Sequence, residues 1–351
     1  VLYLSHVPFE KLGLPKLGVG KADVAKLKGK IRHFYHHGAV YDLEASAEAR
    51  EKANITGTKG ALELAEALNA GGFHLVGSTA AAGLYRGTFT EDMFEEAEEL
   101  EHPYHRTKHD SEAMVRANGR IPFRVYRPGA VLGHSQTGFI DKIDGPYYFF
   151  KALQKLRESW PRSIPLVGIE GGYINVVPVD FVVDALVHLS HQPKLDGRCF
   201  HLTDPKARRV GEVLNVFARA AHAPEMAFRL DPKVFAMIPE PVTQSVQRSK
   251  PIQNVFNQLL RDLQVPRSVL QFINYPTRFD STATQKILDK AKIRVPALED
   301  YAWRLWDYWE RHLDPDLSID RSLKGAVKGK VVMITGGSSG IGEAAAIRIA
   351  E

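Results

Sequence analysis

The run Phe73-His74-Leu75-Val76-Gly77-Ser78 decides the fold class of this chain. Residues 73–76 predict a buried strand, and the small residues 77–83 that follow end it. Helical spacing extends from about His102 to Asn118, and Pro122–Tyr126 predicts the next strand. Strands and helices in alternation are typical of a parallel sheet covered by helices.

The flanking sequence continues this alternation. Upstream, Ile31–His36 predicts a short buried strand and residues 44–69 a helix, whereas Tyr148–Ser159 and Val179–His191 predict helices downstream. Frequent prolines between residues 205 and 300 favour short helices that form a small cap. We therefore expect a Rossmann-type, doubly wound α/β sheet with a small, mainly helical substrate cap.

A second strand and turn appear close to residue 330. Lys330–Ile334 predicts a strand, which is followed by glycines 336, 340 and 342 and an alanine-rich helix start. Glycines let the backbone approach a pyrophosphate, and a helix N-terminus attracts its charge. We expect a first domain over residues 1–315, a charged linker over 316–328, and the truncated start of a second nucleotide-binding domain over 329–351.

Composition excludes several classes of protein. Hydrophobic residues make up 44% and charged residues 25% of 351 positions, which is typical of a globular protein. The net charge is only +5 and the basic residues are scattered along the chain, which argues against a nucleic-acid binder. One cysteine, Cys199, allows neither an internal disulfide nor a multi-thiolate metal site and favours the cytoplasm. Asp180 and Asp184 interrupt the longest apolar stretch, Val176–Leu189. The first residue is not methionine, so we expect an internal segment.

The motif Tyr-x-x-x-Lys occurs twice, as Tyr104/Lys108 and as Tyr147/Lys151. Only the first pair follows a strand-ending hydroxyl, Ser78, by 26 residues and precedes a further strand. We therefore predict that the first pair is catalytic and that the second packs or lines a pocket.

The residue types of this predicted triad fit carbonyl reduction. A spacing of four places Tyr104 and Lys108 on one helix face, where the ammonium is expected to lower the tyrosine pKa and to bind ribose hydroxyls. Tyr104 then acts as the acid, and Ser78 hydrogen-bonds the carbonyl oxygen on which negative charge develops.

The motifs resemble those of short-chain dehydrogenases/reductases (SDRs) of the extended type. The resemblance runs from about residue 20 to 315 and rests on His33-x-x-His36-His37-Gly38-Ala39, Asn54-x-x-Gly57-Thr58, Tyr104-x-x-x-Lys108 and Tyr126-Arg127-Pro128-Gly129. Within that superfamily the chain is similar to the thioester-reductase-like, or male-sterility, branch. It is most similar there to bacterial two-domain alcohol-forming fatty acyl-CoA reductases, which join an extended SDR to a short-form SDR.

This resemblance implies NADPH-dependent reduction of a fatty acyl thioester, on coenzyme A or an acyl carrier protein, or of a fatty aldehyde to the alcohol. It places Ala39 and Val40 near the cofactor phosphates and Asn54 as a structural or relay residue. It also implies cofactor contacts for Pro128, Gly129, Val131 and, in the second domain, Gly336, Gly340 and Gly342. The family's first strand and Gly-x-x-Gly-x-x-Gly loop are absent. Gly77 stands where a hydroxyl residue is common, so Thr79 is the alternative to Ser78.

Two other functions stay open on the sequence: an extended SDR that acts on a nucleotide sugar or sterol, and a non-catalytic fragment with the same fold.

Three histidines, at 33, 36 and 37, lack acidic or thiol partners at ligand spacing, so we expect no metal. Trp303, Trp306 and Trp309 recur at helical spacing, which favours a docking helix over a membrane contact. A homo-oligomer also stays open.

Overall fold

Four parallel strands form the main sheet of the protein. In spatial order they are β1 (Phe34–His36), β2 (Phe73–Val76), β4 (Phe123–Pro128) and β9 (Cys199–Leu202). All four run in the same direction, so their carboxyl ends meet at one edge of the sheet, where α/β proteins bind ligands.

A computed structural model gives this fold. It describes residues 14–40, 45–141, 143–160, 166–230, 275–318, 333–334, 338 and 340–350. The chain divides into two compact units, Val1–Trp306 and Asp307–Glu351, and each is described by itself. In the described ranges, no helix combines the length and the apolar character needed to cross a bilayer.

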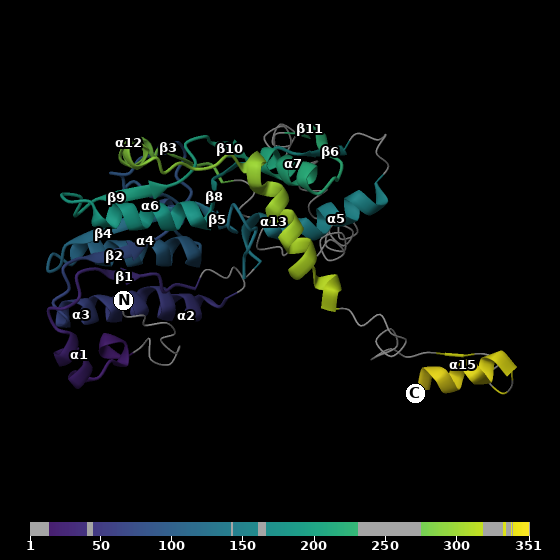
Figure 1. Cartoon of the computed structure of the whole chain (residues 1–351), viewed down its shortest axis with the longest axis horizontal. Helices are drawn as coiled ribbons and strands as arrows, with labels where there is room; N and C mark the ends of the chain where they lie inside the picture. Colours follow the sequence, from purple (N-terminus) through teal and green to yellow (C-terminus); the bar gives the residue numbers. More distant parts are fainter. Residues whose placement is uncertain are drawn as a thin grey trace, which may run out of the picture. The chain divides into compact units, whose positions relative to one another are not determined.

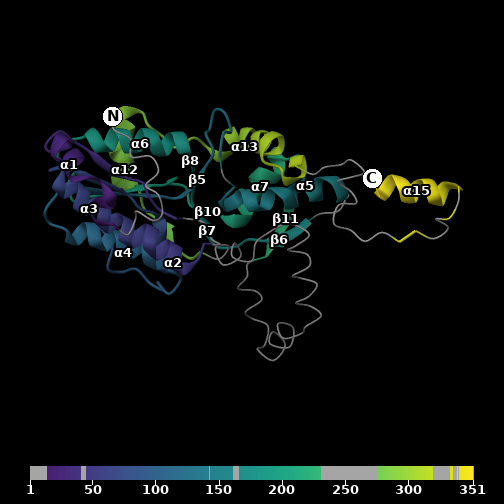
Figure 2. The same ribbon diagram turned by 90° about the horizontal axis from the view of Figure 1, so that it is seen from below.

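Helices cover both faces of the sheet (Figure 2). On one face, α3 (Gly57–Ala67) and α4 (Pro103–Ala117) pack on β2 and β4 around Phe73 and Val125. On the other, α6 (Val179–His191) and α12 (Thr282–Leu288) pack around Tyr126 and Phe200. Adjacent residues of β4 serve opposite faces because side chains alternate along a strand. The predicted doubly wound parallel sheet is confirmed.

The predicted helix over residues 44–69 is continuous but not uniform. It begins with α2 (Ala47–Arg50), widens into a π-helical turn over Glu51–Thr56, and continues as α3. Such turns often occur at functional sites. The wide turn contains Asn54, which is 1% exposed.

A smaller lobe lies beyond the carboxyl ends of the sheet strands (Figure 1). Its helices are η5 (Gly145–Phe149), α5 (Phe150–Ser159), α7 (Val210–Ala220) and the part of α13 (Leu298–His312) that ends at Trp306. Three short two-stranded sheets join them: β5 (Ala130–Leu132) with β8 (Val176–Pro178), β6 (Leu166–Ile169) with β11 (Met226–Leu230), and β7 (Tyr173–Ile174) with β10 (Arg208–Arg209). The predicted cap between residues 205 and 300 supplies α7 and the start of α13 to this lobe, and residues 130–178 supply much of the rest. Residues 231–274 lie outside the described part.

The remaining elements of the first unit are short. They are η2 (Pro15–Gly18), α1 (Lys21–Leu27), η4 (Thr79–Ala82), η6 (Asp289–Ala291) and the parallel pair of β3 (Thr88–Phe89) with β12 (Arg278–Phe279).

Helix α13 corrects the predicted tryptophan stripe. Leu305 and Trp306 are buried, whereas Trp303 is 53% exposed. Trp303 lies two residues from Leu305, which is about 200° around a helix, so the two face opposite directions.

In the second unit the structure describes η7 (Pro315–Ser318) and α15 (Gly340–Ala350). Helix α15 begins at Gly340, inside the predicted glycine turn and before the predicted alanine-rich helix start, and that residue has a φ of +62°. Gly336 and most of the predicted strand Lys330–Ile334 lie outside the described residues. The domain boundaries drawn from the sequence stay predictions.

Candidate active site

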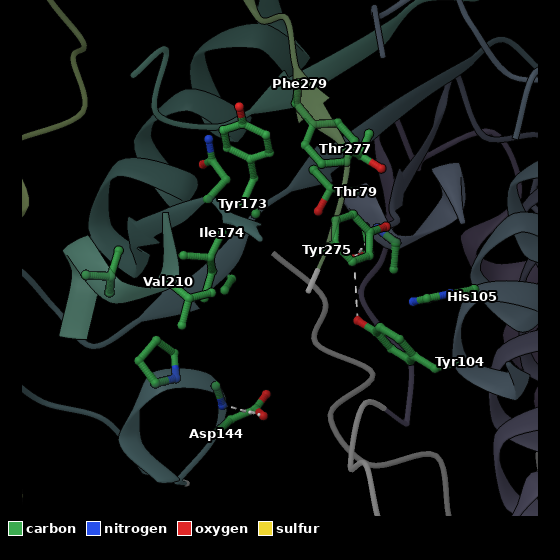
Figure 3. A pocket seen from close by; sticks show the side chains of 18 of the residues that line it. Thr79, Tyr104, His105, Asp144, Tyr173, Ile174, Val210, Tyr275, Thr277 and Phe279 are labelled. Atoms are coloured by element: carbon green, nitrogen blue, oxygen red, sulfur yellow. Dashed lines mark hydrogen bonds between the residues drawn. The ribbon is translucent and has the colours of Figure 1, made fainter. Parts of the chain in front are cut away.

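Ser78 and Tyr104 meet where a strand ends and a helix begins. Ser78 lies two residues beyond the end of β2 and caps η4, because its hydroxyl accepts a hydrogen bond from Ala80 N at 3.1 Å. Tyr104 lies in the first turn of α4, where His102 Nδ1 accepts from Tyr104 N at 3.2 Å and Pro103 occupies the first helical position. The two hydroxyl oxygens lie 3.4 Å apart (Figure 3).

Lys108 lies one helical turn beyond Tyr104 and is 7% exposed. Burial lowers the pKa of its ammonium to about 8. In the described part of the chain the Lys108 ammonium forms no hydrogen bond or ion pair, so its three donors remain available. A buried cation of this kind is costly unless a ligand supplies acceptors.

The ionisation of Tyr104 differs from the prediction. Burial raises the pKa of Tyr104, and the carboxylate of Asp144 raises it further, whereas the hydroxyl of Ser78 and the charge of Arg50 lower it only in part. Lys108 is not among the groups that lower this pKa. The predicted lowering is wrong for the chain alone because removal from water opposes the phenolate.

Asn54 joins the loop after β1 to α4. Its Oδ1 accepts from Val40 N at 2.8 Å, and its Nδ2 donates to Val40 O at 3.2 Å and to Thr107 Oγ1 at 3.1 Å. Both amide hydrogens are therefore used. The contacts make Asn54 a clamp between the loop that contains Ala39 and Val40 and the helix that presents Tyr104.

A cavity of about 210 Å³ opens beside Ser78 and Tyr104. Figure 3 shows Tyr104, Asp144, Ile174 and Tyr275 around it. Most of its remaining wall is apolar or aromatic and comes from Ala130, Pro146, Phe149, Tyr173, Val210, Val213, Leu214 and Phe279. The cavity therefore suits an apolar group next to a reacting oxygen.

The segment after β4 reaches this cavity only in part. Gly129 lines it, and a Cβ on Gly129 would lie 2.6 Å from Asn175 O, so only glycine fits. Pro128 ends β4 and is buried. Val131 lies on β5, is 37% exposed and is outside the described lining.

The second Tyr-x-x-x-Lys pair packs, as predicted. Tyr147 is 1% exposed, and its hydroxyl accepts from Gly133 N at 3.0 Å. Lys151 Nζ donates to Gln154 Oε1 at 2.6 Å. Neither residue is in the described lining of the cavity.

Three residues beside Tyr104 were not predicted from the sequence. Asp144 caps η5 at Gly145 N, 2.7 Å away. Tyr275 donates its hydroxyl proton to Gly83 O. Burial lowers the pKa of His105 to about 4. Asp144 and Tyr275 come from segments far along the chain, and no spacing rule connects them with Tyr104.

The histidines near β1 bind other side chains. His33 Nδ1 lies 2.9 Å from His74 Nε2, and His36 Nε2 lies 3.1 Å from Thr58 Oγ1. Within the described ranges, no group of three side chains could hold a metal ion.

Three similarities to known proteins bear on this site. A family model described as male sterility protein, an NAD-binding type, matches residues 11–186. A linear gramicidin synthase protein of Brevibacillus parabrevis is 29% identical over 204 residues, which is 56% of this chain. Glycine betaine reductase ATRR of Emericella nidulans is 27% identical over 273 residues, which is 74% of this chain. The chain spans only 4% and 20% of the length of these two relatives.

The fold has a similar solved structure, the terminal R domain from the myxalamid PKS-NRPS biosynthetic pathway. Its TM-score is 0.66 at 24% sequence identity, and the match covers 86% of this chain and 73% of that one.

Proposed function

Because the chain belongs to the male sterility protein family, a thioester-reductase-like branch of the extended SDRs, we propose that it reduces long-chain fatty acyl thioesters or fatty aldehydes with NADPH. The product is the fatty alcohol. The thioester is carried by coenzyme A or by an acyl carrier protein.

One observation carries this proposal. Two hydroxyls, of Ser78 and Tyr104, lie 3.4 Å apart at the edge of a mostly apolar cavity. A carbonyl oxygen placed between them would accept a hydrogen bond from each, where negative charge develops during reduction.

The raised pKa of Tyr104 suits the reductive direction. A protonated phenol is the form that can donate, and burial keeps Tyr104 in that form at neutral pH. Tyr104 would pass its proton to the substrate oxygen as an alcohol forms. Ser78 would orient that oxygen and share its charge.

The residues present also fit a nicotinamide cofactor. Lys108 offers a buried ammonium that lacks a partner in the described part of the chain, which matches the hydroxyls of a ribose. When bound, NADPH supplies the hydride. Asn54 would hold the Val40 loop and the catalytic helix in register on the cofactor side.

The walls of the cavity favour an acyl chain over a sugar. Tyr173, Ile174, Val210 and Leu214 present mainly carbon to the cavity. The carboxamide of Asn175 is engaged with the backbone of Asp204, to which it donates at 2.7 Å and from which it accepts at 2.8 Å. Sugar hydroxyls would therefore find few replacements for their hydrogen bonds to water, because Asp144 and the hydroxyls of Thr79 and Thr277 are a minority of the wall.

Turnover of the whole protein that contains this chain tests the proposal. We expect NADPH oxidation with palmitoyl-CoA and with decanal, and a loss of about 100-fold or more in kcat for Tyr104→Phe. Tyr147→Phe is the matched control, since it removes a buried tyrosine hydroxyl from the second Tyr-x-x-x-Lys pair and should leave kcat within about threefold. Absence of turnover on both substrates, or equal kcat for Tyr104→Phe and the wild type, would contradict the proposal.

A further inference from the structure

Glu112 is a carboxylate enclosed on the buried face of the catalytic helix. It is 0% exposed and lies one turn beyond Lys108 and two turns beyond Tyr104. Its Oε1 accepts from Arg127 Nη2 at 2.6 Å and from Arg116 Nε at 2.7 Å, and its Oε2 accepts from Arg127 Nε at 2.9 Å. Both carboxylate oxygens are therefore occupied by arginines.

Arg127 is fixed from its other side. It is 0% exposed on β4, and its Nη1 and Nη2 each donate to Met93 O at 3.1 Å. Its Nη1 also lies 3.3 Å from His201 Nε2. The guanidinium thus spans the space between α4 and the loop before it, with no freedom to turn.

The carboxylate lies directly beneath the catalytic strand end. A Cβ on Gly77, the residue before Ser78, would be 3.9 Å from Glu112 Oε2. Gly77 N also donates to Tyr126 O at 2.8 Å, next to Arg127 in β4. The ion pair therefore joins the helix that bears Tyr104 and Lys108 to β4, next to the residue before Ser78.

A buried ion pair contributes little net stability, because removing two charges from water costs about as much as their attraction returns. Its consequence for Lys108 is more specific. Side chains four residues apart on a helix can pair, so Glu112 is a natural partner for the Lys108 ammonium. In the structure that pair does not form, and the pKa of Lys108 stays low, at about 8.

We propose that Arg127 is a positioning residue that holds the Glu112 carboxylate away from Lys108 and so keeps the ammonium available for the reaction. Arg116 assists from the same helix. The role in turnover rests on the proposed function, but the effect on Lys108 does not.

The charged and titratable groups around this arrangement come from several elements. His36 on β1 is the group whose charge interacts with Lys108, and Tyr104 and Glu112 lie one turn before and one turn after it on α4. Those around the ion pair itself are Glu91, Arg116, Cys199 and His201.

The protonation of Lys108 tests the proposal without any need for turnover. Trace acetylation by acetic anhydride as a function of pH, read by peptide mass spectrometry, gives the midpoint for Lys108. In Arg127→Met we expect the midpoint to rise by about 1–3 pH units, because the released carboxylate pairs with the ammonium. In Arg127→Met/Glu112→Met the midpoint should return to that of the wild type, because no carboxylate remains.

Arg124→Met is the matched control. Arg124 is a buried arginine of the same strand on the opposite face, where it pairs with Asp196 at 2.8 Å and donates to Leu189 O. Its removal should leave the Lys108 midpoint unchanged. If Arg127→Met does not fold, Arg127→Lys, which keeps a cation but loses the two-point contact with Glu112, should raise the midpoint in the same direction by a smaller amount.

An unchanged midpoint in folded Arg127→Met, or in folded Arg127→Lys when the first variant does not fold, overturns the proposal. A midpoint that stays raised in the double variant overturns it as well. In kinetics, Arg127→Met should lower kcat more than it raises KM, with partial rescue by Arg127→Lys. Failure of the wild type to turn over would contradict the proposed function and leave the labelling result standing.

Discussion

Lys108 shows how burial sets the chemistry of one residue. The ammonium is 7% exposed, and its pKa lies near 8, where that of an exposed lysine is 10.5. Its charged form is therefore lost within the range in which enzymes are ordinarily assayed.

This pKa predicts an alkaline limit for turnover. Since the ammonium loses its proton as the pH rises through about 8, we expect kcat/KM to fall above that pH, about tenfold for each further unit. In Lys108→Arg the alkaline fall of kcat/KM should begin only beyond about pH 9.5, because arginine stays charged. The value of kcat/KM below that pH should be lower than in the wild type. A pH–rate profile of both proteins measures this, and a limb at the same pH in both would contradict it.

Asn54 predicts a local loss of order. Asn54→Ala removes three hydrogen bonds of a buried carboxamide, so we expect it to cost about 1–3 kcal/mol and to expose the Val40 amide to faster hydrogen exchange. Asn215→Ala is the control, because Asn215 binds both the N–H and the C=O of Met226 in the same way within the smaller lobe. Urea unfolding and exchange measured by mass spectrometry report the two effects. Equal protection of Val40 in both variants would disprove the clamp.

The sequence predicted that Ser78 and Tyr104 lie together, which the structure shows, but it did not predict their electrostatics. Ser78, Tyr104 and Lys108 follow a short spacing pattern tied to a strand and a helix, so one chain segment carries the information. The pKa of Tyr104 depends on Asp144, Arg50 and the depth of burial, which no local pattern encodes. Tyr275 likewise reaches the cavity only through the tertiary fold.

At the scale of elements, periodicity located the strands and the helix that bears Tyr104 but missed changes within them. Helix α4 occupies Pro103–Ala117, as its cap and stop signals indicate, whereas the π-turn over Glu51–Thr56 has no sequence signal of its own. The strand expected from Ile31 begins at Phe34. Strand starts are poorly marked because the pairing partner decides where the ladder begins.

Helix α13 has one buried and one exposed tryptophan, so we expect their replacement by alanine to lower the free energy of unfolding by different amounts. The ring of Trp306 lies 5.1 Å from that of Phe150, and the side chain is 4% exposed. We expect Trp306→Ala to lower the free energy of unfolding by about 3–5 kcal/mol and Trp303→Ala by less than about 0.5 kcal/mol. Thermal or urea unfolding of the two variants makes the comparison. Similar losses would mean that the helix buries a different face.

At the scale of the whole molecule, buried histidines connect stability to pH. His74, His105 and His201 are 2%, 3% and 0% exposed, and their environments are built from strands, loops and helices that lie far apart in the sequence. The burial of these histidines could not be predicted from composition, because it depends on which elements pack over the sheet and over α4.

These three histidines predict acid destabilisation. Burial is the largest cause that lowers their pKa values, to about 3 for His74, about 4 for His105 and about 3 for His201, against 6.5 for an exposed group. As the pH falls below 6.5 the unfolded chain binds protons that the folded chain does not, so stability falls, by about 2 kcal/mol for each histidine at pH 5. Carboxylates with lowered pKa values, such as Glu112, reduce the stability further only below about pH 4.5, where they begin to take up protons in the unfolded chain. Urea unfolding followed by far-ultraviolet circular dichroism should therefore give a lower midpoint at pH 5.0 than at pH 7.5, and His74→Gln should reduce the difference. Equal midpoints at the two pH values would show that these histidines gain protons without unfolding.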